Sequence, residues 1–256
     1  MIFYQPSIDP VILSLGIVNI RWYSLAYIAG FVLGSFLIKH LNKKHNILTN
    51  KQIDNFFIWS ILGVILGGRI GYVLFYQTSY FISDPLYIFK IWTGGMSFHG
   101  GLIGIIVSIF IFSKKNNIDF FYLSDLVSIV APIGLFLGRI ANFINTELYG
   151  RITDFPFAVI YSSIDNQPRH PSQVYEAFLE GIILFAILLT LFNKTKLSSM
   201  GKISGYFLIY YSVFRFLVEF LREPDSHIGL ILNFLTMGQI LSIPLIIIGI
   251  MILKKS

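Results

Sequence analysis

Four polar side chains share one helical face in an apolar stretch near the end of the chain: Tyr211, Arg215, Glu219 and Arg222. They stand at i, i+4, i+8 and i+11, which at about 100° per residue places them within an arc of about 80°. Arg215 and Glu219 are four residues apart and can pair directly. A guanidinium binds phosphate oxygens in a fork and stays charged in a dry site, so this stripe is suited to bind an anion.

Two further arginines, Arg69 and Arg139, interrupt other apolar stretches, and Asn142 shares a helical face with Arg139. A histidine, His99, lies among closely spaced glycines. Glycines around a histidine indicate either backbone close to a ligand or a broken entry to a helix. A histidine that only stabilises the start of a helix is the simpler interpretation.

The composition requires a membrane around these residues. Of the 256 residues, 55% are hydrophobic and 12% are charged, whereas a soluble domain is about 25% charged. Disorder requires low hydrophobicity, and a disulfide scaffold requires cysteine, which the sequence lacks. We therefore predict an all-α integral membrane protein, a single membrane-embedded domain over residues 1–256. Seven apolar segments are long enough to be considered as transmembrane helices: 23–38, 56–76, 98–112, 123–143, 174–192, 204–220 and 234–253.

The lysines orient the predicted helices. Eleven of the twelve lysines follow the first, third, fifth and seventh segments, and positive residues favour the cytoplasmic side. The N-terminus is then outside and the C-terminus is cytoplasmic. In this topology Arg69, Arg139 and Arg215 all lie in the outer half of the bundle, below an outer segment at about 144–173. No metal-ligand spacing recurs among the five histidines, so we expect no metal and no cofactor.

The depth of the arginines favours a bound anion. A charge within the membrane costs at least a few kcal/mol, and Glu219 is the one acid close to these arginines in sequence at that depth. Guanidinium groups without partners in the protein would form a binding site for an anion, and a phospholipid headgroup is the obvious one. An ion-pair network that only holds the helices together is the alternative. The glycines Gly63, Gly67 and Gly71 favour close helix packing.

Several strings in the sequence are characteristic of one family. They are RWY at 21–23, GGRIGY at 67–72, GGMSFHGGLIG at 94–104, GRIANFIN at 138–145, ELYGR at 147–151, RHPSQVYE at 169–176 and FRFLVEFLREPD at 214–225. With these strings the chain resembles the bacterial phosphatidylglycerol–prolipoprotein diacylglyceryl transferases over essentially its whole length.

The resemblance implies a reaction and a cellular location for the protein. The sn-1,2-diacylglyceryl group of phosphatidylglycerol would pass to the lipobox cysteine thiol of a prolipoprotein, forming a thioether and releasing glycerol phosphate. The expected partners are phosphatidylglycerol, prolipoproteins and membrane lipids, with no nucleic acid. The expected location is the bacterial cytoplasmic (inner) membrane, with the active site toward the outer face. Because the substrate supplies the thiol, the enzyme needs no cysteine.

The resemblance also implies roles for individual residues. Arg139 and Arg215 would hold the phosphate, and His99 would act as general base or orient the lipid. The remaining expected substrate-binding residues are Tyr23, Asn142, Glu147, Gly150, Tyr211, Glu219 and Arg222. Some family members have a longer outer segment than this chain between the positions of Arg151 and Arg169. This chain would therefore bind its prolipoprotein differently. The competing interpretations are a lipid or anion transporter with an arginine-lined cleft, and a membrane scaffold without chemistry.

Overall fold

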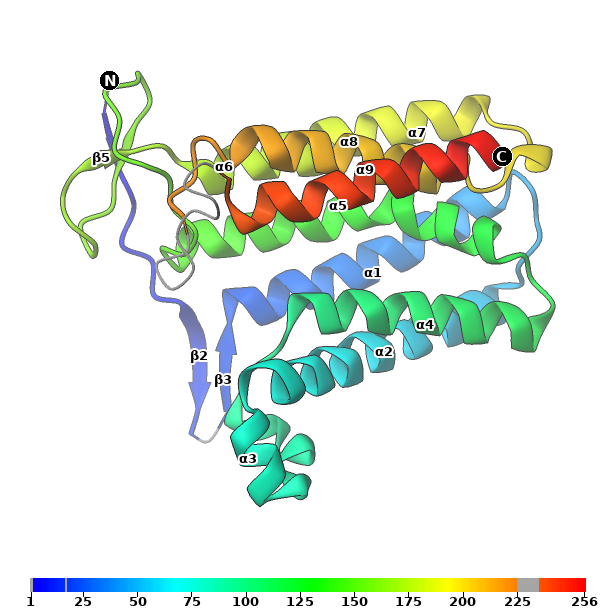
Figure 1. The fold of residues 1–256 in the computed structure, drawn as a ribbon, viewed down its shortest axis with the longest axis horizontal. Helices are drawn as coiled ribbons and strands as arrows, with labels where there is room; N and C mark the ends of the chain where they lie inside the picture. Colours follow the sequence, from blue (N-terminus) through cyan, green and yellow to red (C-terminus); the bar gives the residue numbers. More distant parts are fainter. Residues whose placement is uncertain (1, 17, 225–234) are drawn as a thin grey trace. The chain divides into compact units, whose positions relative to one another are not determined.

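The computed structural model describes residues 2–16, 18–224 and 235–256. The chain forms two compact units, one of Met1–Leu37 with Asp125–Ser256 and one of Ile38–Ser124. Helices make up most of both units (Figure 1). The prediction of one membrane-embedded domain stays a prediction. Phe234, predicted to begin the last segment, and Asp225, at the end of the last matching string, lie outside the described residues.

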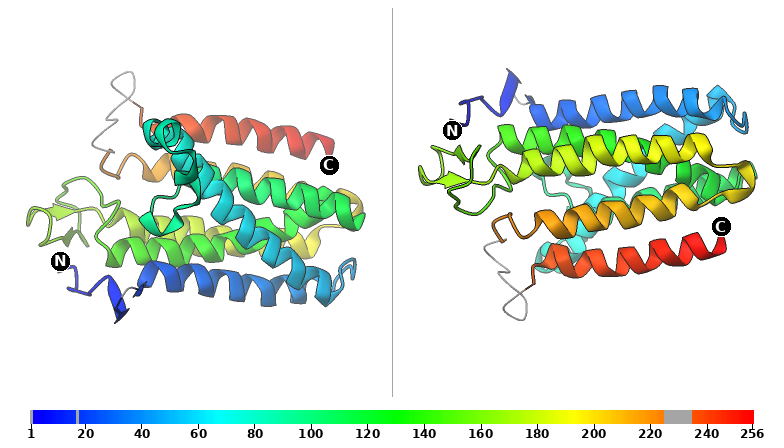
Figure 2. Two further views of the ribbon diagram at one scale, coloured as in Figure 1. Left: turned by 90° about the horizontal axis from the view of Figure 1, so that it is seen from below. Right: turned by 90° about the horizontal axis from the view of Figure 1, so that it is seen from above.

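The first unit contains most of the long helices. α1 (Trp22–Asn42) and α5 (Phe120–Ile144) each extend into the second unit, whereas α8 (Lys202–Val218) and α9 (Met237–Lys255) lie wholly in the first. The remaining long helix of this unit runs without interruption through α6 (Ser172–Glu176), the π-helical η3 (Ala177–Ile183) and α7 (Leu184–Lys194), and the short η4 (Leu197–Ser199) follows it. Within this unit α8 and α9 run side by side in both views of Figure 2.

A buried carboxylate fixes the start of α8. Asp125 on α5 accepts hydrogen bonds from the backbone N–H groups of Gly201 (2.8 Å) and Ser204 (2.7 Å) and from the Ser204 hydroxyl (2.6 Å). The first N–H groups of a helix have no partner within the helix. Asp125 therefore caps the N-terminus of α8 from a neighbouring helix. It thereby fixes where α8, which carries Tyr211 and Arg215, begins relative to α5.

Six helices are long and apolar enough to cross a membrane, judged over the described residues. They are α1, α2 (Asn50–Tyr76), α4 (Phe98–Asn116), α5, the Ser172–Lys194 helix and α9. The prediction of a mostly helical membrane protein is thus confirmed. α8, which covers the remaining predicted segment, is 17 residues long.

Short strands accompany the helices of the predicted all-α membrane protein. β1 (Phe3–Tyr4) pairs in parallel with β4 (Val159–Ile160), which pairs antiparallel with β5 (Pro168–Arg169). β2 (Val11–Leu15) and β3 (Val18–Arg21) form a hairpin. Strands of two to five residues are too short for an alternating hydrophobic pattern to identify them.

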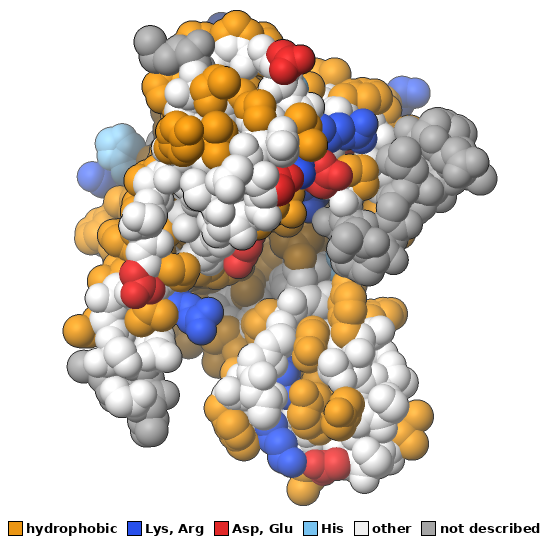
Figure 3. Space-filling model, turned by 90° about the vertical axis from the view of Figure 1, so that its left-hand side faces the viewer, with side chains coloured by type: hydrophobic (Ala, Val, Ile, Leu, Met, Phe, Trp, Pro, Cys, Tyr) orange, Lys and Arg blue, Asp and Glu red, His pale blue; other side chains and the backbone are white. Residues whose placement is uncertain are grey.

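The second unit is built on a close pair of helices, α2 and α4. A Cβ atom on Gly67 would lie 2.9 Å from the Cα of Gly104, and one on Gly71 would lie 2.8 Å from the Cα of Gly100, so the backbones touch. This confirms the packing interpretation of the α2 glycines. Between the two helices lies a segment of three short elements, α3 (Thr78–Ser83), η1 (Pro85–Phe89) and η2 (Ile91–Thr93). Exposed hydrophobic side chains lie on its surface beside polar and charged ones, in the lower right of Figure 3.

Candidate active site: a buried arginine–glutamate cluster

Two of the predicted arginines converge on one buried carboxylate. The Glu176 side chain is fully buried at the end of α6. Its Oε2 lies 2.9 Å from Nε of Arg139 on α5, and its Oε1 accepts a hydrogen bond from Nη1 of Arg215 on α8. One two-oxygen anion therefore bridges the two guanidinium groups that the resemblance assigns to the phosphate.

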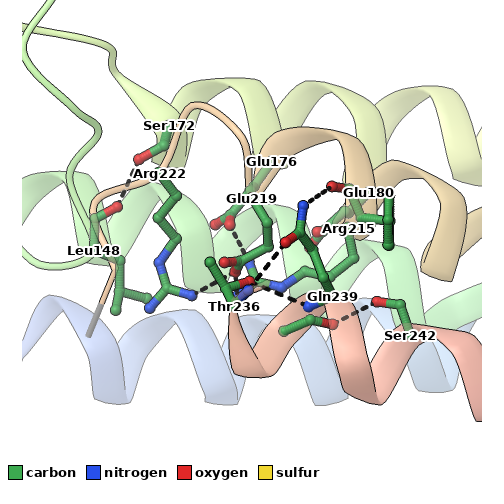
Figure 4. Close-up of polar contacts among 12 residues, drawn as sticks. Leu148, Ser172, Glu176, Glu180, Arg215, Glu219, Arg222, Thr236, Gln239 and Ser242 are labelled. Atoms are coloured by element: carbon green, nitrogen blue, oxygen red, sulfur yellow. Dashed lines mark hydrogen bonds and ion pairs between the residues drawn. The ribbon is translucent and has the colours of Figure 1, made fainter. Parts of the chain in front are cut away.

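Two further glutamates and a third arginine complete this group, which we call the Arg–Glu cluster (Figure 4). Arg139 donates to Oε2 of Glu180 at 3.3 Å, and Arg215 pairs with Oε1 of Glu219, as their spacing predicts. Arg222 donates to the same Glu219 oxygen at 2.8 Å. The members are Arg139, Glu176, Glu180, Arg215, Glu219 and Arg222, whose formal charges sum to zero.

The ends of two helices hold Glu219 in place. α8 ends at Val218, so Arg222 lies beyond the helix on which the sequence pattern placed it, yet it still contacts Glu219. On the other side, a Cβ atom on Gly238 would lie 2.6 Å from Oε1 of Glu219. Gly238 belongs to the first turn of α9, whose Thr236 N-cap forms a capping box with Gln239. The positive end of α9 thus faces a buried carboxylate, an arrangement that stabilises the charge.

The cluster corrects the prediction of arginines without partners. Glu176 and Glu180 lie about 40 and 35 residues before Arg215 in sequence, and helix packing brings them to it. Neither acid was expected to take part in the site. Their four-residue spacing in an apolar segment was the available signal, because buried carboxylates require cationic partners. Arg69, in the second unit, bonds to backbone carbonyls and not to these carboxylates.

The expected headgroup residues lie in the first unit, as the cluster does. Asn142 donates to Oε2 of Glu147 at 2.9 Å, which joins the end of α5 to the outer segment. The ring of Tyr211 stacks on Phe207, with centroids 5.7 Å apart. The Tyr23 ring packs against Tyr27 at 5.2 Å, and its hydroxyl is within electrostatic reach of Arg139.

Gly150 connects the outer segment to the end of α8. It pairs with Arg222 as an isolated β-bridge, and its N–H donates to the carbonyl of His170 at 2.9 Å. A Cβ atom at this position would lie 2.6 Å from the Cβ of His170 and 2.8 Å from the carbonyl oxygen of Leu221. Glycine is therefore required here by close backbone packing, next to the arginine that contacts Glu219.

A second set of charges stabilises the outer segment. Arg169 pairs with Asp165 at 2.5 Å and with Glu223 at 3.1 Å, and its guanidinium lies 5.0 Å from the centre of the Tyr149 ring. The hydrogen bond from Arg169 lowers the pKa of Asp165 and raises that of Arg169. Burial lowers the pKa of the neighbouring His170. Arg169 is buried while its two carboxylate partners are partly exposed, and the three charges pair with one another, which is typical of a structural ion pair.

His99 is the one expected catalytic residue outside the first unit. It is the second residue of α4, is exposed, and packs edge-on against Phe98 with ring centroids 5.6 Å apart. Its relation to the Arg–Glu cluster stays a prediction.

The fold and the cluster define a class: a helical membrane protein with several candidate spans and buried arginines that are paired with glutamates. The family model of prolipoprotein diacylglyceryl transferase matches residues 10–254. The chain is 51% identical to the phosphatidylglycerol–prolipoprotein diacylglyceryl transferase of Rickettsia typhi, over 95% of each chain. It is 49% identical to that of Vibrio campbellii over 97% of this chain and 90% of the relative, and 47% identical to that of Vibrio cholerae over 98% and 92%. The chain belongs to the prolipoprotein diacylglyceryl transferase family.

Proposed function

We propose that this chain transfers the sn-1,2-diacylglyceryl group of phosphatidylglycerol to the lipobox cysteine of a prolipoprotein. Membership of the family over residues 10–254 supports the reaction. The observation that carries the site is the convergence of Arg139 and Arg215 on the two oxygens of Glu176. A phosphodiester also presents two charged oxygens, so guanidinium groups spaced to share a carboxylate can share a phosphate.

In this proposal Glu176 takes the place of the phosphate in the lipid-free protein. When phosphatidylglycerol binds, its phosphate competes with Glu176 for Arg139 and Arg215. Asn142, Glu147, Tyr23 and Tyr211 surround the headgroup, and Glu219 with Arg222 and Gly150 fixes the position of Arg215 and the loop above it.

The reaction then needs little from the protein beyond charge and position. The substrate's thiol attacks the carbon of the diacylglyceryl group that carries the phosphate. The bond between this carbon and the phosphate oxygen breaks, and glycerol phosphate leaves with the bonding electron pair. The two arginines stabilise the leaving anion. The thiol proton passes to His99, which acts as the general base in the transition state.

We further propose seven spans, with the N-terminus outside and the C-terminus cytoplasmic. Lysines occupy the last turns of α1, α4, α7 and α9, as the positive-inside rule expects of cytoplasmic ends. α8 is about 25 Å long and would be the seventh span. Because the chain has no cysteine, single cysteines at Lys43 and Asp165 test this topology. In intact cells, an impermeant maleimide should label the second site and spare the first.

The decisive experiment is a product assay. Purified protein is mixed with phosphatidylglycerol and a peptide bearing a lipobox cysteine, and the mass of the peptide is measured. A gain of one diacylglyceryl unit, lost in Arg139→Ala, supports both reaction and site. An unmodified peptide with well-folded protein would contradict the proposal, and lipid translocation under the same conditions would favour a transporter.

A further inference from the structure

Arg69 on α2 is enclosed by the segment that leads to α4. Its side chain is 2% exposed, and all three of its guanidinium nitrogens donate hydrogen bonds. The acceptors are the carbonyl oxygens of Tyr87 (2.9 Å), Ile88 (3.2 Å), Lys90 (2.8 Å), Gly94 and Gly95 (3.5 Å) and the hydroxyl of Thr93 (3.1 Å). The segment 87–95 is therefore wrapped around one guanidinium group.

Only an arginine can make this arrangement. Within the described part of the chain no ion pair with a carboxylate is found for Arg69, so its charge is compensated by backbone carbonyl dipoles, by the Thr93 hydroxyl and by the Tyr87 ring at 4.9 Å. Arginine presents five N–H groups in a rigid plane and keeps its charge at any relevant pH, whereas lysine presents three on one atom. The lysine side chain could not reach carbonyls on both sides of the fork.

The segment ends at the helix that carries His99. Gly94 and Gly95 adopt positive φ angles of 76° and 84°, and Gly95 lies directly against the Tyr72 ring of α2. The N–H of Ser97 then donates to the carbonyl of Gly68, the neighbour of Arg69, at 2.8 Å. Ser97 is the N-cap of α4 and accepts a hydrogen bond from the N–H of Gly100. The start of α4 is thus tied to α2 immediately beside Arg69.

We infer that Arg69 is a positioning residue for diacylglyceryl transfer, which holds segment 87–97 so that α4 presents His99 in one orientation. The inference rests on the proposed role of His99 as the base for the thiol. A base must approach its proton to within about 3 Å. A displacement of about 1 Å at such a group costs about 100-fold in rate.

The kinetic test compares Arg69→Lys with a matched control in the same segment. Asp84→Asn removes an exposed ion pair to Lys90 and leaves every Arg69 bond in place. We expect Arg69→Lys to lower kcat about 100-fold with the KM for phosphatidylglycerol unchanged, and Asp84→Asn to behave as the parent. A parent-like kcat in Arg69→Lys would overturn the inference.

A distance measurement separates positioning from other effects of the variant. Trp92 and Phe110 are exposed residues of the second unit, and in a cysteine-free chain spin labels at Trp92→Cys and Phe110→Cys are the only labels. We expect Arg69→Lys to broaden the distribution of the distance between the labels. A low kcat with an unchanged distribution would overturn positioning as the cause.

The double variant Arg69→Lys/His99→Gln tests whether Arg69 affects the rate through His99. If Arg69 acts through His99, the double variant is no slower than His99→Gln alone, whereas additive losses would overturn the inference. A parent-like rate in His99→Gln would instead contradict the proposed role of His99. The two failures are therefore distinguishable.

Discussion

The molecule buries arginines in two different ways. In the second unit, Arg69 bonds to backbone carbonyls and one hydroxyl, all within residues 87–95. In the first unit, Arg139 and Arg215 bond to the carboxylates of Glu176, Glu180 and Glu219. Backbone carbonyls can leave only if the segment unfolds, whereas a carboxylate side chain can rotate away and be replaced by another anion.

The difference shows that depth in the membrane does not by itself identify a binding arginine. All these guanidinium groups are at least largely buried, and the sequence pattern treats them alike. The kind of hydrogen-bond acceptor distinguishes Arg69 from Arg139 and Arg215. An arginine that supports a fold is surrounded by fixed dipoles, and one that binds a substrate is paired with groups that can be exchanged.

The largest expected effect comes from removing an arginine of the cluster. Arg215→Ala should lower transfer about 1,000-fold, because one donor to the leaving phosphate is lost. Arg215→Lys should retain part of the activity, since an ammonium group can pair with the same carboxylates and phosphate. The mass of the lipobox peptide after timed reactions measures both. Equal loss in the two variants would show that the forked guanidinium group of Arg215, and not only its charge, is required.

The next effect concerns the exchange of anions. Glu176→Gln changes the formal charge of the cluster from zero to +1, and breaking a buried pair costs about 3–5 kcal/mol of stability. The variant should melt at a lower temperature than the parent in detergent. It should gain more stability from millimolar glycerol phosphate, because a ligand that binds the native state stabilises it by mass action.

Glu223→Gln is the control for this measurement, because Glu223 pairs with Arg169 outside the cluster. It should respond to glycerol phosphate as the parent does. An equal response in Glu176→Gln and the parent would contradict competition between Glu176 and the phosphate.

A smaller effect is expected at the glycine that touches Glu219. Gly238→Ala would place a Cβ atom 2.6 Å from Oε1 of Glu219 and displace the carboxylate that holds Arg215 and Arg222. Transfer should fall about tenfold, as for a catalytic group moved by a fraction of an ångström. Gly205→Ala, on the same helix pair but against Leu253, should affect melting temperature more than turnover. The reverse pattern would exclude Glu219 from the working site.

The smallest expected effect is a change in stability from the ion pair between Arg169 and the partly exposed Asp165. Arg169 lowers the pKa of Asp165 below its ordinary value of 3.8, so the charged pair stabilises the native state above that pH and less as the pH falls through the lowered pKa. Asp165→Asn should melt slightly below the parent at pH 6, and the difference should vanish in strongly acidic buffer. A difference that persists in acid would show that Asp165 acts through packing.

Much of the fold was predictable because the bilayer restricts the choices. Long apolar segments must be helices, since no other element satisfies its backbone in lipid, and six of the predicted segments are confirmed as candidate spans. The Arg215–Glu219 pair followed from four-residue spacing. The contacts of Arg139 with Glu176 and Glu180 did not follow, because they depend on how α5 packs against the Ser172–Lys194 helix. The acceptors of Arg69 are backbone carbonyls, which every residue has and which no sequence pattern distinguishes.

The π-helical turn η3 constrains insertions and deletions in this chain. Glu176 lies just before η3 and Glu180 within it, and Gly181 packs against Phe136 of α5. A π-turn accommodates about one extra residue in a helix. Deleting one residue from 177–183 would remove this extra residue and restore regular α-helix with Glu176 nearly in its present orientation, whereas one further residue in a regular turn would rotate Glu176 by about 100° relative to α7. We therefore expect this stretch to tolerate the loss of one residue better than the gain of one.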